Sequence, residues 1–366
     1  MTRRDPVEAE SDGTRDLYDV STWEPRTALD RLATRVYYGV LSLARGLFIL
    51  LGIFILVAQF LLGGIGATFA DDPFAIGLVV LSVIPALLLV GYIYATDITS
   101  NEPLELLVGT FILGVVFAGF AAIVNALLSF VQVVPVVGIL LFFYLVVGPI
   151  EETVKLLAVR LYAYRSSSFE AVIDGTVYGA VAGLGFATIE NALYITRQLG
   201  MSAGTGTGTE LVALGALGAV TIPVLQVSVE GVLQQALNQG GGITAVRALA
   251  GPGHVIYSAF AGYYLGLAKF NPENSGPIVA KGLIIAAFIH ATYNTLVGLV
   301  PGIVAIFYPN VSQLVIFFGF VLVYDGLFGY ILFRKLRRYR SMYEAVHREA
   351  QRRATSFQSE RTEFED

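Results

Sequence analysis

The hydrophobic positions of this 366-residue chain gather into long runs that contain no Asp, Glu, Lys or Arg. The longest of these runs covers residues 106–150, and others cover residues 46–70, 74–96 and 282–308. A helix needs about 20 apolar residues to cross the hydrocarbon core of a bilayer. The pattern therefore predicts an all-α, polytopic membrane protein built as a bundle of transmembrane helices.

We expect eight transmembrane helices, at residues 46–68, 74–96, 105–130, 136–163, 173–196, 249–268, 282–306 and 312–333. Pro149 lies inside the fourth segment and should kink or break it, because proline lacks a backbone N–H and its ring clashes with the preceding turn. Residues 211–237 begin apolar and become polar in their second half. We expect a re-entrant or interfacial segment there, with a ninth span as the alternative.

The charged residues concentrate at the two ends of the chain. Of the 23 Lys and Arg residues, seven lie in residues 1–45 and nine in residues 334–366. Cytoplasmic segments collect Lys and Arg, so we expect both termini in the cytoplasm and the protein in the cell membrane. This predicts a polar cytosolic arm (1–45), a transmembrane domain (46–333) and a charged cytosolic tail (334–366). No soluble catalytic domain fits at either end, so any chemistry must lie within the membrane domain.

Several ionisable side chains nevertheless fall within the apolar segments or at their ends. They are Glu151, Glu152 and Lys155 after the fourth apolar run, Glu190 beside Asn191, His254, and His290. Such side chains are costly in lipid and usually face a bundle interior or a water-filled cavity. Three acids and two histidines in four separate apolar segments favour one shared site over several unrelated structural roles.

Helical spacing supports a shared site. Residues four apart lie on the same face of a helix, and this spacing relates three pairs: Glu151 and Lys155, Phe186 and Glu190, and His290 and Asn294. Glu152 points about 100° away from Glu151. Four helices could each contribute one polar turn, and glycines in the Glu190 and His254 segments would allow close approach of the backbones.

Carboxylates and imidazoles together suit the activation of water, either by a general base or through a bound metal ion. The chain has no cysteine, which excludes thiolate catalysis and cysteine-ligated metal sites. It also lacks the G-x-S-x-G, H-E-x-x-H and Walker A motifs. Ion pathways use the same residue types, so an ion-coupled transporter and a non-catalytic scaffold remain alternatives to a hydrolase.

Four short motifs follow one another on successive predicted helices. They are Glu-Glu-x-x-Lys at 151–155, Phe-x-x-x-Glu-Asn at 186–191, a histidine after Gly-Pro-Gly at 254, and His-x-x-x-Asn at 290–294. In this order they resemble the PrsW family of intramembrane proteases, related to the type II CAAX prenyl proteases and the bacteriocin-processing and immunity proteins. The resemblance covers residues 105–335. It implies hydrolysis of peptide bonds in membrane-associated protein or peptide substrates. The expected partners are therefore these substrates and the lipid bilayer, and no nucleic acid is expected to bind.

The resemblance also implies roles for individual residues. The implied catalytic residues are Glu151 and Glu152, one of which would activate water, Glu190 as the acid of the second motif, and His254 and His290, which would orient water and stabilise the oxyanion. The implied supporting residues are Lys155 as a charge partner, Asn191 and Asn294 as hydrogen-bonding supports, and Phe186.

A zinc ion is the alternative means of activating water. His254, His290, Glu190 and Glu152 could supply its ligands and leave one position open for water. No two of these residues lie four apart on one helix, and Asn294, which does lie four after His290, is a poor zinc ligand. The spacing therefore favours metal-free catalysis by a glutamate, with zinc as the alternative.

Overall fold

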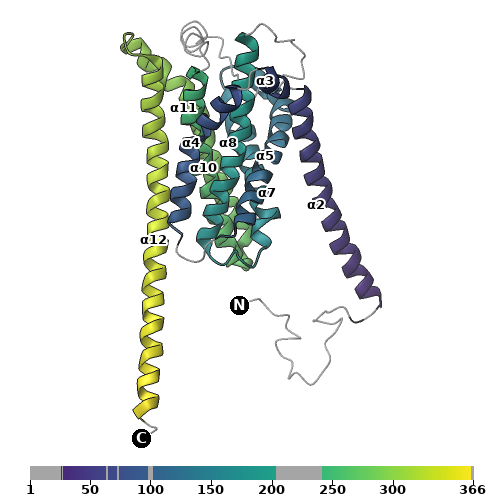
Figure 1. Ribbon diagram of the computed structural model, residues 1–366, viewed down its shortest axis with the longest axis vertical. Coiled ribbons are helices and arrows are strands. Elements are labelled where there is room, and N and C mark those ends of the chain that lie inside the picture. The colour runs from purple at the N-terminus through teal and green to yellow at the C-terminus, as the bar shows by residue number, and fades with distance from the viewer. Residues whose placement is uncertain are drawn as a thin grey trace. The chain divides into compact units, whose positions relative to one another are not determined.

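The computed structural model describes residue 26 and residues 28–62, 65–71, 74–97, 102–202 and 241–363 (Figure 1). These residues form helices and turns, and no strand occurs among them, so the predicted all-α class is confirmed. The segment 211–237, predicted to be re-entrant, lies outside the described residues. The chain divides into two units, Met1–Ile53 and Phe54–Asp366, and helix α2 (Ala28–Leu62) begins in the first.

The second unit holds the remaining helices. They are α3 (Ile65–Asp71), α4 (Phe74–Ala95), α5 (Leu104–Leu127), α6 (Gly138–Phe142), α7 (Gly148–Leu161), α8 (Val172–Ser202), α10 (Gly241–Lys269), α11 (Ser275–Phe307) and α12 (Gln313–Glu363). Short helical turns, η1 (Ser129–Val133), η2 (Phe143–Val147), η3 (Ala163–Arg165) and η5 (Pro272–Asn274), lie between them.

Five stretches in the described part of the chain are long and apolar enough to cross a membrane. They are Ala75–Ala95, Leu104–Leu127, Val172–Leu199, Pro272–Phe307 and Gln313–Glu344. A shorter apolar stretch covers Arg45–Leu61. These helices agree with a polytopic bundle. Helices α7 and α10, which we also predicted to lie in spans, are not among the five, and both carry buried charged residues. The total of eight spans stays a prediction.

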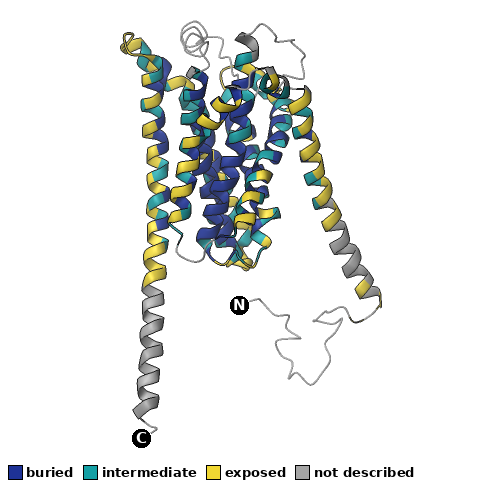
Figure 2. Ribbon diagram, viewed as in Figure 1, coloured by how far each residue is buried: buried dark blue, intermediate teal, exposed yellow. Residues whose placement is uncertain are grey.

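Helix α8 lies at the centre of the second unit, where it packs against α4, α5, α7 and α10. Within an apolar window of 18 residues in this helix 83% of the residues are buried, against 28–50% in the corresponding windows of the other four spanning stretches. Figure 2 shows the buried residues concentrated in the central helices, whereas the described side chains of α12, at residues 313–344, are often exposed. A polar side chain on α8 is therefore surrounded by protein.

A stripe of glycines lets α8 approach α10 closely. Gly175, Gly179 and Gly183 lie four residues apart on one face of α8. A Cβ atom on Gly179 would collide with the backbone carbonyl of Ser258, and one on Gly183 with that of His254. Small residues favour helix association in membranes because they permit such backbone contacts. This contact sets the Glu190 helix directly against the His254 helix.

We expect Gly179→Ala to push these two helices apart. The new methyl group would meet backbone rather than a flexible side chain, so the free energy of unfolding should fall by about 1–3 kcal/mol. Thermal unfolding in detergent measures this effect. The matched control is Gly91→Ala in α4, where a Cβ atom meets nothing within 4 Å. Equal unfolding temperatures for the two variants would contradict the packing argument.

The segment around Pro149 is helical, but its hydrogen bonding changes before the proline. The five residues of η2 form a π-helical turn, in which the N–H of Gly148 bonds to the carbonyl of Phe143, five residues earlier. Pro149 then occupies the first turn of α7, where its missing N–H is tolerated. Of the predicted kink or break, a break does not occur; regular α-helical hydrogen bonding is replaced by a π-turn just before the proline. Such turns are frequent at functional sites, and Glu151 follows within one helical turn.

Candidate active site

The five side chains predicted to be catalytic meet in one buried cluster. Glu151 and Glu152 come from α7, Glu190 from α8, His254 from α10 and His290 from α11. One carboxylate oxygen of Glu151 and one ring nitrogen of each histidine lie within 4.8 Å of one another. The two imidazole rings meet edge to face, with centroids 5.2 Å apart.

Glu152 has its carboxylate fully engaged by neighbouring side chains. Its Oε1 accepts a hydrogen bond from Lys155 Nζ at 2.7 Å and lies 2.9 Å from His290 Nδ1. Its Oε2 accepts a hydrogen bond from the Ser258 hydroxyl at 3.3 Å. A carboxylate accepts but does not donate, so Nδ1 of His290 carries the proton. Glu152 therefore orients His290 and has little capacity left to bind water.

Glu151 differs from its neighbour because one of its oxygens has no partner. Asn125 Nδ2 donates to Oε1 at 3.2 Å, but Oε2 is buried and forms no hydrogen bond with any described residue. This Oε2 lies 3.7 Å from His290 Nε2, which is an acceptor when the imidazole is neutral with its proton on Nδ1. Two acceptors thus face each other across a short gap. An unpaired buried acceptor is costly, so this gap suits a bridging water or a cation.

His254 is held between an acid and a base. Its Nε2 lies 2.9 Å from Glu190 Oε2, and its Nδ1 lies 2.9 Å from Lys155 Nζ. An ammonium group only donates, so Nδ1 accepts and Nε2–H donates to Glu190, which gives a neutral imidazole. The Arg247 guanidinium also bonds to Glu190 Oε2, and its Nε donates to Asn191 Oδ1 at 2.8 Å. Glu190 therefore links His254 to a second buried cation.

The predicted supporting residues differ in the contacts that they make with the cluster. The ring of Phe186 packs 5.4 Å from that of His254, and Lys155 Nζ lies 4.3 Å above it. Asn191 supports the site indirectly, since it bonds to Arg247 and donates to Ser82 Oγ of α4 at 3.0 Å. Asn294 lies within α11, but its side chain forms no hydrogen bond with another described residue, so it does not join the hydrogen-bonded cluster.

The motifs did not identify three residues that complete this cluster. They are Asn125, Arg247 and Ser258. Each left a signal in the sequence. Ser258 follows His254 by four residues and Arg247 precedes His254 by seven, so Arg247, His254 and Ser258 share one face of α10. Asn125 is one of only two side-chain amides, with Gln132, within the longest uncharged run. A polar residue alone in an apolar run, or at helical spacing from a predicted site residue, is thus an informative signal.

We expect Arg247→Met to destabilise the protein strongly. The change leaves the Glu190 carboxylate buried without its cationic partner, and breaking a buried pair in this way costs about 3–5 kcal/mol. A second change, Glu190→Gln, removes the stranded charge and should recover part of the loss. Thermal unfolding in detergent of the single and double variants measures both effects. A single variant as stable as wild type would show that the pair does not support the fold.

Three residues of the cluster have the chemistry of a metal site. Glu151, His254 and His290 each offer one ligand atom within the 4.8 Å group. Each histidine also points its other nitrogen at a carboxylate, as metal-bound histidines commonly do: His254 at Glu190 and His290 at Glu152. The residues therefore fit a zinc-type ion. In this geometry Glu151 takes the ligand position, whereas Glu152 and Glu190, the acids expected as ligands from the sequence, lie behind the histidines.

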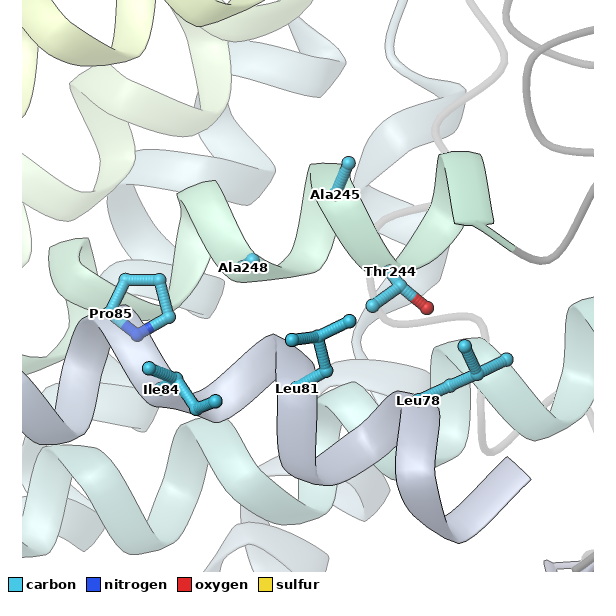
Figure 3. Close-up of a pocket in the computed structure, with 7 residues that line it drawn as sticks. All are labelled: Leu78, Leu81, Ile84, Pro85, Thr244, Ala245 and Ala248. Atoms are coloured by element: carbon cyan, nitrogen blue, oxygen red, sulfur yellow. The ribbon is translucent and has the colours of Figure 1, made fainter. Parts of the chain in front are cut away.

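An apolar groove opens at the contact between α4 and α10 and is separate from the cluster. It is lined by Leu78, Leu81, Ile84, Pro85, Thr244, Ala245 and Ala248 (Figure 3). None of the candidate site residues lines it. Its α10 wall nevertheless flanks Arg247, so the groove and the cluster share one stretch of this helix.

Comparison with known proteins identifies related sequences. A family profile described as "PrsW family intramembrane metalloprotease" matches residues 102–324, a range that contains the whole cluster. The chain is similar to Protease PrsW of Shouchella clausii (strain KSM-K16), with 24% identity over 60% of this chain and 82% of the relative. It is also similar to Protease PrsW of Bacillus subtilis (strain 168), with 26% identity over 58% of this chain and 78% of the relative. No solved structure matches.

Proposed function

The chain belongs to the PrsW family of intramembrane proteases, and we propose that it hydrolyses peptide bonds of membrane-associated proteins at the cluster around Glu151. The observation that carries the proposal is the pair of facing acceptors, Glu151 Oε2 and His290 Nε2, 3.7 Å apart and buried. A water molecule between them would find an acceptor for its proton and a fixed orientation toward a substrate carbonyl.

Glu151 is the residue we assign to the activation of water, either as the base that contacts it or as a ligand of a cation that binds it. Its Oε2 is unpartnered among the described residues, and Asn125 fixes its other oxygen. Glu152 already meets Lys155, His290 and Ser258, so its part is to hold His290. The adjacent glutamates thus have separate roles, one in contact with the reacting water and one acting through a histidine.

The charges of the cluster leave room for a cation. Glu151, Glu152 and Glu190 contribute three negative charges, and Lys155 and Arg247 contribute two positive charges, if both histidines are neutral. One uncompensated negative charge remains inside a low-dielectric site, which a bound cation or a proton would offset. The charge balance is therefore compatible with a cation at the group formed by Glu151, His254 and His290, whose ligand atoms support that choice.

We infer that this cation is a zinc-type metal ion held by Glu151, His254 and His290. When bound, such an ion lowers the pKa of water to about 7 and polarises a carbonyl. Glu152 and Glu190 would keep both histidines in the ligating tautomer by accepting their other N–H groups. The absence of an i,i+4 ligand pair does not argue against a metal here, because the three ligands come from three different helices.

Lys155 has a position from which it can assist the reaction. Its ammonium group touches both Glu152 and His254, and it keeps one further N–H. This donor can stabilise negative charge that develops on the substrate carbonyl oxygen.

The proposal is tested with purified protein in proteoliposomes that contain single-span reporter peptides labelled at both ends. We expect time-dependent separation of the labels within or near the bilayer. Liposomes that contain reporter without protein are the control. A transporter would instead move ions without cutting any reporter, so ion flux measured on the same vesicles distinguishes the two classes. Coupled ion flux without cleavage would contradict the proposal.

A further inference from the structure

A second group of carboxylates lies at the end of the bundle where α4 ends and α5 and α8 begin. It consists of Asp97, Glu102 and Asp174, which each offer one oxygen within 4.8 Å of the others. Asp174 precedes Glu190 by 16 residues on α8, which corresponds to about 24 Å along the helix. This group is therefore separate from the candidate active site.

Glu102 carries the feature that points to a ligand. Glu102 is only 3% exposed. The Tyr178 hydroxyl donates to its Oε2, while its Oε1 is buried and has no hydrogen-bond partner among the described residues. An oxygen of a carboxylate is rarely buried without a donor or a cation, because its desolvation is then uncompensated.

Asp174 is fixed in position by the start of its own helix. Its Oδ2 accepts hydrogen bonds from the backbone N–H groups of Glu170 at 2.6 Å and Ala171 at 2.9 Å. The carboxylate is thus held by local structure, independently of any ligand. A preorganised carboxylate beside the open oxygen of Glu102 supplies two of the oxygen ligands that a hard cation requires.

We propose that Asp97, Glu102 and Asp174 bind a hard divalent cation such as Ca²⁺. The three side chains supply only oxygen, which suits Ca²⁺ or Mg²⁺ and disfavours the ions that prefer imidazole or thiolate. The bound ion would join the end of α4 to the starts of α5 and α8. It would thereby stabilise the position of the helix that carries Glu190, without contact with the substrate. The proposal is independent of the proteolytic function.

A proton competes with the cation for this site. The pKa of Glu102 is raised to about 8: burial is the largest cause, the hydrogen bond from Tyr178 opposes it, and nearby Asp174, Asp97 and Glu170 add to the rise. Cation binding should therefore tighten as the pH rises toward 8 and above. Measurements near pH 8.5 reduce this competition.

The test uses Tb³⁺, which replaces Ca²⁺ at oxygen sites and emits when a nearby tyrosine is excited. Tyr178 bonds directly to Glu102, so it is placed to sensitise an ion bound there. We expect full-length protein in detergent to show tyrosine-sensitised Tb³⁺ emission that Ca²⁺ displaces. Glu102→Gln should weaken binding at least about tenfold, because it removes a charged ligand.

Three further variants make the result decisive. Glu105→Gln, three residues later and exposed, is the matched control and should bind like wild type. Glu151→Gln should also keep the emission, which separates this site from the catalytic cluster. Should Glu102→Gln fail to fold, Asp97→Asn replaces it.

Ca²⁺ should also raise the unfolding temperature of wild type and Glu105→Gln but not of Glu102→Gln. Equal Tb³⁺ titrations for Glu102→Gln and Glu105→Gln would overturn the proposal, as would stabilisation by acid with no response to Ca²⁺.

Discussion

Replacing Glu151 by glutamine is expected to lower kcat/KM for peptide cleavage by about 10²–10⁴-fold, the usual contribution of a positioned acid–base group. The change keeps the side-chain volume and leaves an oxygen that can still accept from Asn125. It removes the negative charge that would take a proton from water or bind a cation. The loss should therefore appear in catalysis, whichever of these two ways activates the water.

The control for this variant is Glu105→Gln, which makes the same chemical change at an exposed position of α5. Both variants should insert in the membrane and elute from a sizing column like wild type. Cleavage of the double-labelled reporter in proteoliposomes is the measurement. Wild-type kcat/KM in a folded Glu151→Gln protein would remove Glu151 from the reaction.

Glu152→Gln and His290→Ala should behave as members of one unit. His290→Ala removes a group that faces the reacting water, and we expect a loss of about 10²–10⁴-fold in kcat/KM. Glu152 acts through the hydrogen bond to His290 Nδ1, so Glu152→Gln should cost about 10–100-fold. The double variant should be no slower than His290→Ala alone, because the second change has no imidazole left to orient.

Steady-state cleavage by the four proteins, wild type included, completes this double-mutant cycle. The metal content of each protein gives an independent reading, and it should fall in both single variants. Losses that multiply in the double variant would mean that Glu152 contacts water or substrate directly. The separation of roles between the two glutamates would then be wrong.

The helical class and the meeting of the site residues follow from physical constraints that the sequence displays. Uncharged runs of about 20 or more apolar residues have the length of membrane-spanning helices, which satisfy their own backbone hydrogen bonds, and this is why the all-α bundle was predictable. Buried charge in lipid must be compensated, so Glu190, His254 and His290, on three different apolar segments, were expected to converge. The structure brings all three together with Glu151 and Glu152.

The separate roles of the two glutamates could not be predicted from spacing. They depend on which neighbour reaches each carboxylate: Asn125 from α5 meets Glu151, and Ser258 from α10 meets Glu152. Such contacts depend on the rotation of α7 after the π-turn, which no periodicity in the sequence encodes. The same limit applies to Asn294: it lies one helical turn from His290, which suggested a hydrogen bond that its side chain does not form with any described residue.

The choice between metal-dependent and metal-free catalysis could not be predicted for the same reason. The expectation of metal-free catalysis rested on ligands that share one helix, whereas Glu151, His254 and His290 come from three helices that pack together. Close packing of α8 on α10 through Gly179 and its neighbours helps to position one of them, and the register of that contact is a tertiary property. Sequence spacing within single helices therefore cannot decide between a metal and a lone glutamate.

The most direct measurement is the zinc content and the cleavage rate of one purified sample, before chelation, after chelation and after zinc is returned. We expect close to one zinc ion per chain, loss of cleavage with a strong chelator, and recovery when zinc is added. Glu151→Gln protein should bind less zinc and stay inactive throughout. Full cleavage by protein that retains no metal after chelation would contradict a metal site at Glu151, His254 and His290.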